Sequence, residues 1–172
     1  VPPQSVAQNL IDTAARLPDK VAIHYYGTQI TYSQLLDRVE RIAGWLQTRG
    51  VKRGDRVLLY LQNSPQWIIG YYAILRADAA VIPVNPMNRH AELEHLARDT
   101  GARVAIAGSE LVDHIQPLVG SGDLDHILAA AYADMADHQS DIRLPDALAS
   151  LTDTDVTGAG ITRWRDAIAD DI

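Results

Sequence analysis

The strongest constraint on the fold is a set of four apolar runs of strand length that recur at nearly constant distance along the chain. They begin near Val57, Val81, Val104 and His126, so the spacings are 24, 23 and 22 residues. Strands that are apolar throughout are buried on both faces, as parallel strands in α/β layers are. Parallel neighbours need crossover connections, and helical stretches lie between these runs. The pattern predicts an α/β fold: a parallel sheet with flanking helices, built from βαβ units.

Three helices are expected between these strands, at Pro65–Ala77, Ala91–Thr100 and Ser109–Val119. The first has almost no polar face, because the segment from Trp67 to Leu75 contains only apolar and aromatic residues and one glycine. A helix that is apolar all round is normally buried. We therefore expect other structure to cover this helix, including parts of a longer protein.

Capping residues predict two helices in the first 50 residues. Ser5 can begin a short amphipathic helix that ends near Leu17. Thr31 can begin a longer one, because Gln34 completes a capping box and Gly50 stands where a left-handed residue would end the helix. Two short strands are expected between these helices, at Val21–Tyr26 and Gln29–Thr31, with a turn at Gly27 and Thr28.

Composition narrows the class of protein. The chain has 172 residues and a net charge of −7. Because it contains no cysteine, disulfides, thiolate nucleophiles and thiolate metal sites are excluded. Its 15 Lys and Arg residues are scattered, which argues against a nucleic-acid partner. It has no apolar run of transmembrane length and no secretion signal at its start. We expect a soluble, cytoplasmic protein with no transmembrane segment.

The last 41 residues differ in composition from the rest. From Tyr132 onward there are nine Asp and no Glu, separated by small residues and Thr. We therefore predict two parts, an α/β N-terminal subdomain at 1–131 and a less ordered acidic tail at 132–172. Within the tail, short helices are expected at Tyr132–Asp137 and Asp146–Leu151, then a turn through Gly158 and Gly160, then a helix at Thr162–Ala169.

The turns give no sign of a phosphate-binding loop. A dinucleotide fold needs glycine in the turn after its first parallel strand, so that backbone N–H groups can approach a pyrophosphate. The turns at Gln62–Pro65 and Asn85–Asn88 contain none. Spaced glycines at Gly120–Gly122 and Gly158–Gly160 are interpreted as turn glycines. We predict no cofactor-binding residue in this chain.

Metal and phosphorelay sites are not predicted either. The strand ends carry Gln62, Asn85 and Gly108 where a phosphorelay receiver would need carboxylates. No two histidines lie four residues apart on a helix, as a helical zinc site would need. The histidines are interpreted as structural or surface residues, at positions His24, His90, His95, His114, His126 and His138.

The remaining candidates for catalysis have structural explanations. Ser64 precedes Pro65 and is interpreted as a helix start, not as a nucleophile. Glu92 and Glu94 lie in a first helical turn, where the helix dipole favours acids. A pair at Asp153 and Asp155 would lack the burial that splits the pKa values of catalytic carboxylates. We predict no catalytic residue and no metal ligand.

Three segments in succession resemble the N-terminal subdomain of AMP-forming acyl-CoA synthetases, the adenylate-forming relatives of aryl-CoA ligases and luciferases. They are LPDKVAIHYYGTQITYSQL at Leu17–Leu35, GVKRGDRVLLYLQNSPQWIIGYYAILRADAAVIPVNPMN at Gly50–Asn88, and ELEHLARDTGARVAIAG at Glu92–Gly108. The stretches Tyr71–Arg76 and Pro83–Asn88 are most similar to bacterial long-chain-fatty-acid–CoA ligases. One departure is Asp78, where the family often has glycine.

The resemblance implies a parent enzyme that activates a fatty acid with ATP and Mg to an acyl-adenylate and transfers the acyl group to CoA. Thr162–Ala167 and Asp170–Ile172 resemble the approach to the family's phosphate loop, which is expected beyond Ile172 together with the catalytic lysine. The chain alone is therefore expected to be inactive and to bind no cofactor. Its expected partner is the rest of its own ligase chain.

Two alternatives stay open. The substrate of the parent enzyme can be an aryl or other short carboxylic acid instead of a fatty acid. The chain can also be a stand-alone α/β module that binds a partner protein through the apolar helix at Pro65–Ala77.

Overall fold

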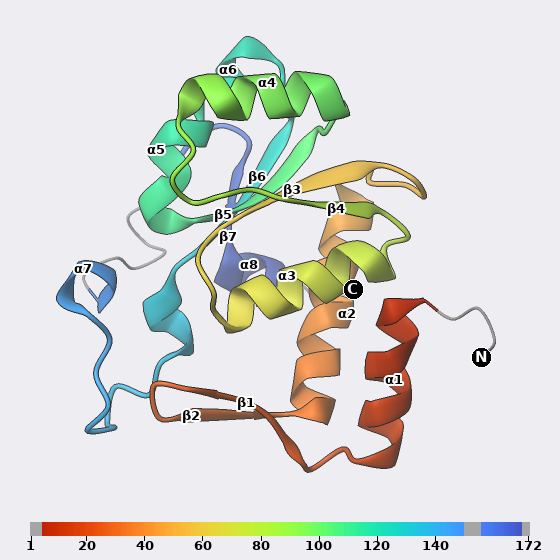
Figure 1. Cartoon of the computed structure of the whole chain (residues 1–172), viewed down its shortest axis with the longest axis vertical. Helices are drawn as coiled ribbons and strands as arrows, with labels where there is room; N and C mark the ends of the chain where they lie inside the picture. Colours follow the sequence, from red (N-terminus) through yellow and green to blue (C-terminus); the bar gives the residue numbers. More distant parts are fainter. Residues whose placement is uncertain (1–4, 150–155, 170–172) are drawn as a thin grey trace.

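The computed structural model describes residues 5–149 and 156–169. A five-stranded sheet lies between two layers of helices, and a separate two-stranded hairpin lies beside them (Figure 1). The strand order is β4-β3-β5-β6-β7, and every neighbouring pair in this sheet is parallel. The predicted α/β fold with a parallel sheet is confirmed.

Four strands of the sheet match the four apolar runs, and the fifth was not expected. Residues 161–163 form β7, which pairs with β6, so the helix predicted to begin at Thr162 is wrong at its start. Three residues are too short a run to show a strand pattern. The strands are β3 (Arg56–Tyr60), β4 (Ala80–Pro83), β5 (Val104–Gly108), β6 (His126–Ala130) and β7 (Ile161–Arg163).

Burial follows the position of each strand in the sheet. The strands β5 and β6 lie inside the sheet and are buried almost throughout. The expectation of burial on both faces is wrong for β4, where Ala80 and Pro83 are exposed and Val81 and Ile82 are half-buried. The reason is that β4 is an edge strand and pairs only with β3.

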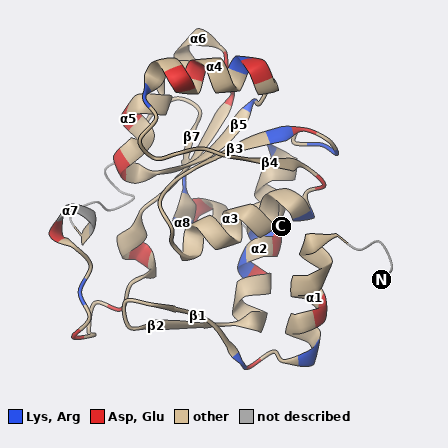
Figure 2. Cartoon of the chain, viewed as in Figure 1, with Lys and Arg blue, Asp and Glu red and all other residues tan. Residues whose placement is uncertain are grey.

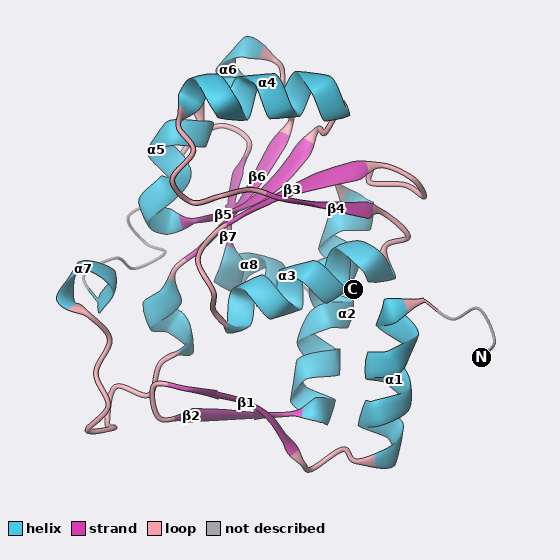
Figure 3. Cartoon of the chain, viewed as in Figure 1, coloured by secondary structure: helices cyan, strands magenta, loops and turns pink. Residues whose placement is uncertain are grey.

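Alternate residues of each inner strand belong to two separate cores. In β3, Val57 and Leu59 join a core with α2 (Tyr32–Thr48) and α3 (Pro65–Arg76), whereas Leu58 joins a core with α4 (His90–Thr100). This alternation is the two-residue period of a strand. Figure 3 shows the sheet between its two helical layers.

The N-terminal elements begin and end as their capping residues predict. In α1 (Val6–Arg16), Ser5 Oγ accepts a hydrogen bond from Gln8 N–H. The capping box of α2 is present, because Thr31 N–H donates to Gln34 Oε1 at 3.0 Å and Gln34 N–H donates to Thr31 Oγ1 at 3.3 Å. Gly50 follows α2 with a φ of 84°. The hairpin strands are β1 (Val21–Tyr25) and β2 (Thr28–Thr31).

The helix expected from Ser109 to Val119 is three short pieces. They are a 3-10 turn η1 (Ser109–Leu111), α5 (Val112–Ile115) and α6 (Pro117–Ser121). Pro117 has no N–H to donate and its ring disfavours the preceding helical turn, so a new helix begins there.

The apolar helix α3 is covered on one side by the sheet and α2. Its buried residues include Ile69, Ala73 and Ile74, while the rings of Trp67 and Tyr71 are half-buried and stack with centroids 5.5 Å apart. The prediction that other structure covers this helix is therefore confirmed for the side that faces the sheet and α2.

The described part of the segment 132–172 adds to the same sheet. It contains a 3-10 turn η2 (Tyr132–Met135), α7 (Asp146–Ala149), β7 and α8 (Trp164–Ala169). Trp164 is 2% exposed and Ala167 is fully buried, both in the core that α2 and α3 share. The division at residue 131 stays a prediction. The predicted end of a helix at Leu151 lies outside the described residues.

Candidate functional site

The topology singles out one place in the sheet where a ligand could bind. The neighbouring strands β3 and β5 are followed by segments on opposite faces, α3 on one and α5 on the other. In open parallel sheets, ligands bind at the carboxyl ends of the strands at such a switch point. Here those ends lead into Gln62 and Ser109. We take this crevice as the candidate site.

The side chain of Tyr132 links the segments that line the crevice. It follows β6 and is 1% exposed. Its hydroxyl accepts a hydrogen bond from Gln62 N–H at 2.8 Å and donates one to Glu110 Oε1 at 2.8 Å. A Cβ atom on Gly108 would lie only 2.4 Å from this hydroxyl, so the glycine makes room for the tyrosine. The crevice is thus filled by the chain's own side chains.

Burial controls the ionisation of these groups. It raises the pKa of Glu110, although the hydrogen bond from Tyr132 acts in the opposite direction. Burial also raises the pKa of Tyr25 to about 12, and the neighbouring Tyr26 and Glu110 add to this shift. Glu110 Oε2 is buried without a hydrogen-bond partner in the described parts of the chain. The Tyr132 hydroxyl already donates its one proton to Glu110, so it has none left for a phosphate, and an ionised Glu110 would repel an anion.

A second loop at the same edge of the sheet is held by an arginine. Arg89 Nη1 donates to the carbonyl oxygens of Pro86, Met87 and Asn88 at 3.1, 2.8 and 3.0 Å. The hydroxyl of Tyr60 also donates to Asn88 O. Met87 is 78% exposed. The loop therefore has a fixed conformation and presents one apolar side chain to solvent.

Ser64 and Glu92 have the structural roles that the sequence predicted. Ser64 Oγ accepts from Trp67 N–H at 3.2 Å and begins α3, so its interpretation as a helix start is confirmed. Glu92 Oε2 accepts from Arg89 N–H at 2.9 Å, and backbone hydrogen bonds lower its pKa. Both side chains are engaged in starting a helix.

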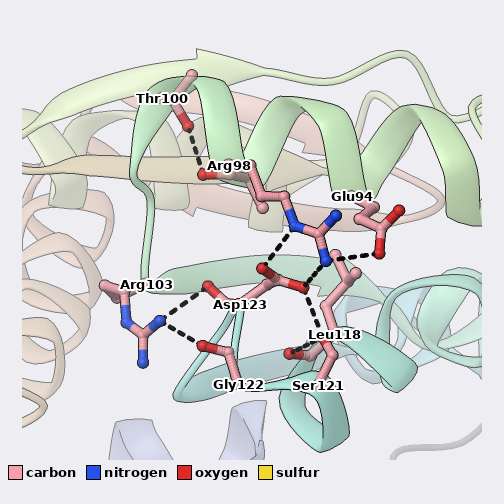
Figure 4. A network of polar contacts seen from close by, with 9 residues as sticks. Glu94, Arg98, Thr100, Arg103, Leu118, Ser121, Gly122 and Asp123 are labelled. Atoms are coloured by element: carbon pink, nitrogen blue, oxygen red, sulfur yellow. Dashed lines mark hydrogen bonds and ion pairs between the residues drawn. The ribbon is translucent and has the colours of Figure 1, made fainter.

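A turn closed by charged side chains follows α6, and of the two glycines at 120 and 122 only Gly122 lies in this turn. Figure 4 shows Arg98 between Glu94 and Asp123, with contacts of 2.8 Å to Glu94 Oε1 and 2.9 Å to Asp123 Oδ1. Ser121 Oγ donates to the same Asp123 carboxylate at 2.6 Å. Gly122 has a φ of 81°, which favours glycine. The turn-glycine interpretation is confirmed for Gly122 and is wrong for Gly120, which lies inside α6.

In the second glycine pair, Gly158 and Gly160, the structure gives Gly160 a role in the backbone path. Gly160 O accepts a hydrogen bond from Ile127 N–H at 2.8 Å, next to the start of β7. A Cβ atom on Gly160 would lie 2.7 Å from Asp125 O. Gly160 therefore allows the chain to approach β6 closely.

Residues 10–156 match the family described as AMP-binding enzyme. The chain belongs to the AMP-binding enzyme family. A long-chain-fatty-acid–CoA ligase of Bacillus subtilis (strain 168) is 34% identical over 145 residues, which make up 84% of this chain and 26% of that protein. The resemblance to adenylate-forming ligases is confirmed.

Two solved structures share the fold of this AMP-binding chain. Coronafacic acid ligase from Pectobacterium brasiliense has a TM-score of 0.75 at 18% identity, over 97% of this chain and 30% of its own. The anthranilate CoA ligase AuaEII, in complex with anthranoyl-AMP, has a TM-score of 0.69 at 24% identity, over 73% of this chain and 25% of its own. The predicted fold, the N-terminal subdomain of an adenylate-forming ligase, is confirmed.

The AMP-binding chain is short beside its relatives. It spans about a quarter of the length of the long-chain-fatty-acid–CoA ligases that it matches. No helix within residues 5–149 and 156–169 is long and apolar enough to cross a membrane.

Potential metal ligands of the AMP-binding chain do not gather in its described part. No group of three His, Cys, Asp or Glu side chains there could hold a metal ion. Figure 2 shows Lys and Arg interspersed with Asp and Glu around the ribbon. The candidate pair Asp153 and Asp155 lies outside the described residues.

Proposed function

We propose that this chain is the N-terminal part of a cytoplasmic ligase that uses ATP and Mg to convert a fatty acid to an acyl-adenylate and then transfers the acyl group to CoA. The observation that carries the proposal is the 34% identity to the Bacillus subtilis long-chain-fatty-acid–CoA ligase over 84% of the chain. The chemical need is general: a carboxylate is a poor acyl donor until AMP becomes its leaving group.

In this proposal the chain supplies walls and support, and the reacting groups come from elsewhere in the ligase. Tyr132 and Glu110 fill the switch-point crevice. The turns at 62–65 and 85–88, which follow β3 and β4, contain no glycine. Backbone N–H groups need such glycines to approach a phosphate closely.

Isothermal titration calorimetry of the 172-residue chain with ATP and Mg tests whether this part of the ligase binds nucleotide by itself. The expected result is no measurable heat of binding and no formation of acyl-adenylate from fatty acid. Micromolar affinity for ATP would show that the chain holds a nucleotide site of its own.

The acid substrate has two candidate classes. A fatty acid is favoured by the Bacillus subtilis relative, and an aryl acid by the fold shared with the anthranilate CoA ligase. Pyrophosphate exchange by the full-length protein, with palmitate, octanoate, benzoate and anthranilate compared at equal concentration, separates them. Faster exchange with benzoate or anthranilate than with palmitate would contradict the fatty-acid proposal.

A protein-interaction module is the second candidate function. It is favoured by α3, whose stacked Trp67 and Tyr71 are only half-buried. Sedimentation velocity of the chain, with Trp67→Ser as the matched variant, tests it. Reversible association that the substitution abolishes would support the module, and a monomer at all concentrations would favour the ligase. Reading the codons downstream of Ile172 would show directly whether the coding sequence continues into a phosphate loop.

A further inference from the structure

A cavity of about 250 Å³ lies at the amino-terminal edge of the sheet, opposite the switch-point crevice. It is bordered by the turn between α2 and β3, by the turn between α4 and β5, and by the residue that precedes β6. The charged side chains of its lining are Arg49, Arg56, Arg103, Asp55 and Asp125. Three arginines from different segments thus meet two acids around one cavity.

Both aspartates of the lining already have partners. Arg103 donates to both carboxylate oxygens of Asp125, from Nε at 2.9 Å and from Nη2. Asp55 Oδ2 accepts a hydrogen bond from Lys52 N–H at 2.8 Å and closes the turn before β3. Because Arg103 and Asp125 neutralise one another, the other two arginines of the lining outnumber the one remaining acid.

The guanidinium of Arg56 is held in place with one nitrogen left over. Its Nε donates to Thr100 O at the end of α4, and its Nη1 donates to Gly54 O at 3.1 Å. Its Nη2 has no acceptor in the described parts of the chain, but it is not among the buried polar atoms there that lack a partner, so solvent reaches it. A Cβ atom on Gly101 would lie 2.8 Å from Nη2, which places this nitrogen beside a residue of the cavity lining.

Arg49 offers a second guanidinium without a carboxylate partner. Its side chain is exposed and forms no ion pair and no side-chain hydrogen bond within the described residues. Its Cζ atom lies 5.5 Å from the ring centre of Trp45, a contact that favours one position of the group. Burial lowers the pKa of His126, and the charge of Arg49 adds to this shift, so that charge reaches the start of β6, which borders the cavity.

The turn before β3 concentrates positive charge in a chain whose net charge is −7 (Figure 2). Four of its side chains are basic and one is acidic, namely Arg49, Lys52, Arg53, Arg56 and Asp55. Three net positive charges attract a dianion more strongly than a monoanion. A phosphate also has enough oxygen atoms to accept hydrogen bonds from two guanidinium groups at once.

The size of the cavity indicates a small ligand. Sites for larger organic ligands have volumes of about 300–1,000 Å³, and this cavity lies below that range. The exposed large apolar residues of the described chain, which could enter a membrane, lie elsewhere, at Val6, Leu17, Met87 and Ile142. The carboxyl ends of α2 and α4 oppose an anion, but hydrogen bonds from charged donors are stronger than the effect of a helix dipole at the surface.

We propose that this cavity binds the phosphate group of a small phosphorylated compound, with Arg49 and Arg56 as the donors. The site uses only residues of this chain and lies at the opposite edge of the sheet from the switch-point crevice. It does not rest on the proposed ligase activity, so either proposal can fail alone.

Titration of the ¹⁵N-labelled chain with inorganic phosphate, at constant ionic strength, tests the site. The amide signals of Gly50 and Gly101, which line the cavity, are expected to move and to saturate. Arg49→Gln should weaken binding about tenfold or more, since the loss of one hydrogen bond from a charged group has about this effect. Arg56→Gln should weaken binding as well. Because Arg56 also supports the end of α4, the exposed Arg49 is the position that decides.

Arg16→Gln is the matched control. Arg16 is likewise exposed at the end of a helix, has no ion pair in the described parts of the chain, and lies outside the cavity lining. This variant should bind phosphate as the unaltered chain does, and acetate should bind more weakly than phosphate.

The proposal is overturned if the signals of Gly50 and Gly101 do not saturate, if Arg49→Gln binds phosphate unchanged or no more weakly than Arg16→Gln, or if acetate binds as tightly as phosphate. Cosedimentation of the chain with phosphatidylglycerol vesicles, without saturable shifts from inorganic phosphate, would also overturn it and assign the basic turn to a lipid surface.

Discussion

The hydroxyl of Tyr132 lies 2.8 Å from Oε1 of Glu110, and this contact joins the segments that follow β6 and β5. The same hydroxyl accepts a hydrogen bond from Gln62 N–H, in the segment that follows β3. One buried tyrosine thereby connects the carboxyl ends of three strands. The crevice at the switch point is consequently part of the support of the fold.

Replacing Tyr132 with Phe should therefore destabilise the chain without emptying its core. The ring stays, but Gln62 N–H and Glu110 Oε1 lose their partner, which should cost about 1–3 kcal/mol of unfolding free energy. Chemical denaturation monitored by circular dichroism measures this. Tyr26→Phe serves as the control, because that residue is outside the contact, and an equal loss in both variants would contradict the explanation.

Glu110 should make the stability of the chain depend on pH. Its pKa in the folded chain is raised from the ordinary 4.5 by burial, so the folded state binds the proton more tightly than the unfolded state. Stability is then full below the ordinary pKa and falls as pH rises through the raised value. Glu110→Gln, which keeps an acceptor for Tyr132, should be more stable than the unaltered chain at pH 8 and lose that advantage below pH 4. A constant difference at all pH values would exclude this linkage.

The layers of the fold could be predicted from the sequence because long elements with a regular apolar pattern are recognisable from that pattern alone. The apolar runs at β3, β5 and β6 and the capping box of Thr31 and Gln34 were located within one or two residues. The strand β7 was missed, because its three residues form a strand only by pairing with β6. Tertiary pairing, not local preference, decides such a short element.

The candidate sites were less visible in the sequence. Glu110 and Tyr132 are 22 residues apart and were not singled out, since nothing in their local pattern shows that two strand ends bring them together. Gly108 was the one feature of the sequence that could have indicated this site, because a glycine at the end of a buried strand often marks the close approach of another group.

Asp78 occupies a backbone position that suits glycine. Its φ is 58°, and Gly54 N–H donates to its carbonyl oxygen at 2.9 Å, so the turn keeps its shape with Asp in it. Aspartate tolerates the left-handed region better than β-branched residues do. Asp78→Val should cost about 1–2 kcal/mol, whereas Asp78→Gly should be at least as stable as the unaltered chain. The midpoints of thermal unfolding measure the difference. Because the Asp78 side chain is exposed, the substitutions change the backbone preference without changing core packing.

Gly70 allows α3 to pack closely on the sheet. A Cβ atom there would lie 3.0 Å from Leu59 Cδ1 and 3.2 Å from Ile106 Cδ1, so a methyl group would force these two buried side chains, or the helix, to move by a few tenths of an ångström. Gly70→Ala should lower the unfolding free energy by about 1–3 kcal/mol despite the better helix propensity of alanine. Gly120→Ala is the matched control, because this glycine lies in α6 with nothing within 4 Å of a new Cβ. The control should be neutral or stabilising by up to about 1 kcal/mol. If both variants behaved alike in chemical denaturation, α3 would not need the close contact that Gly70 permits.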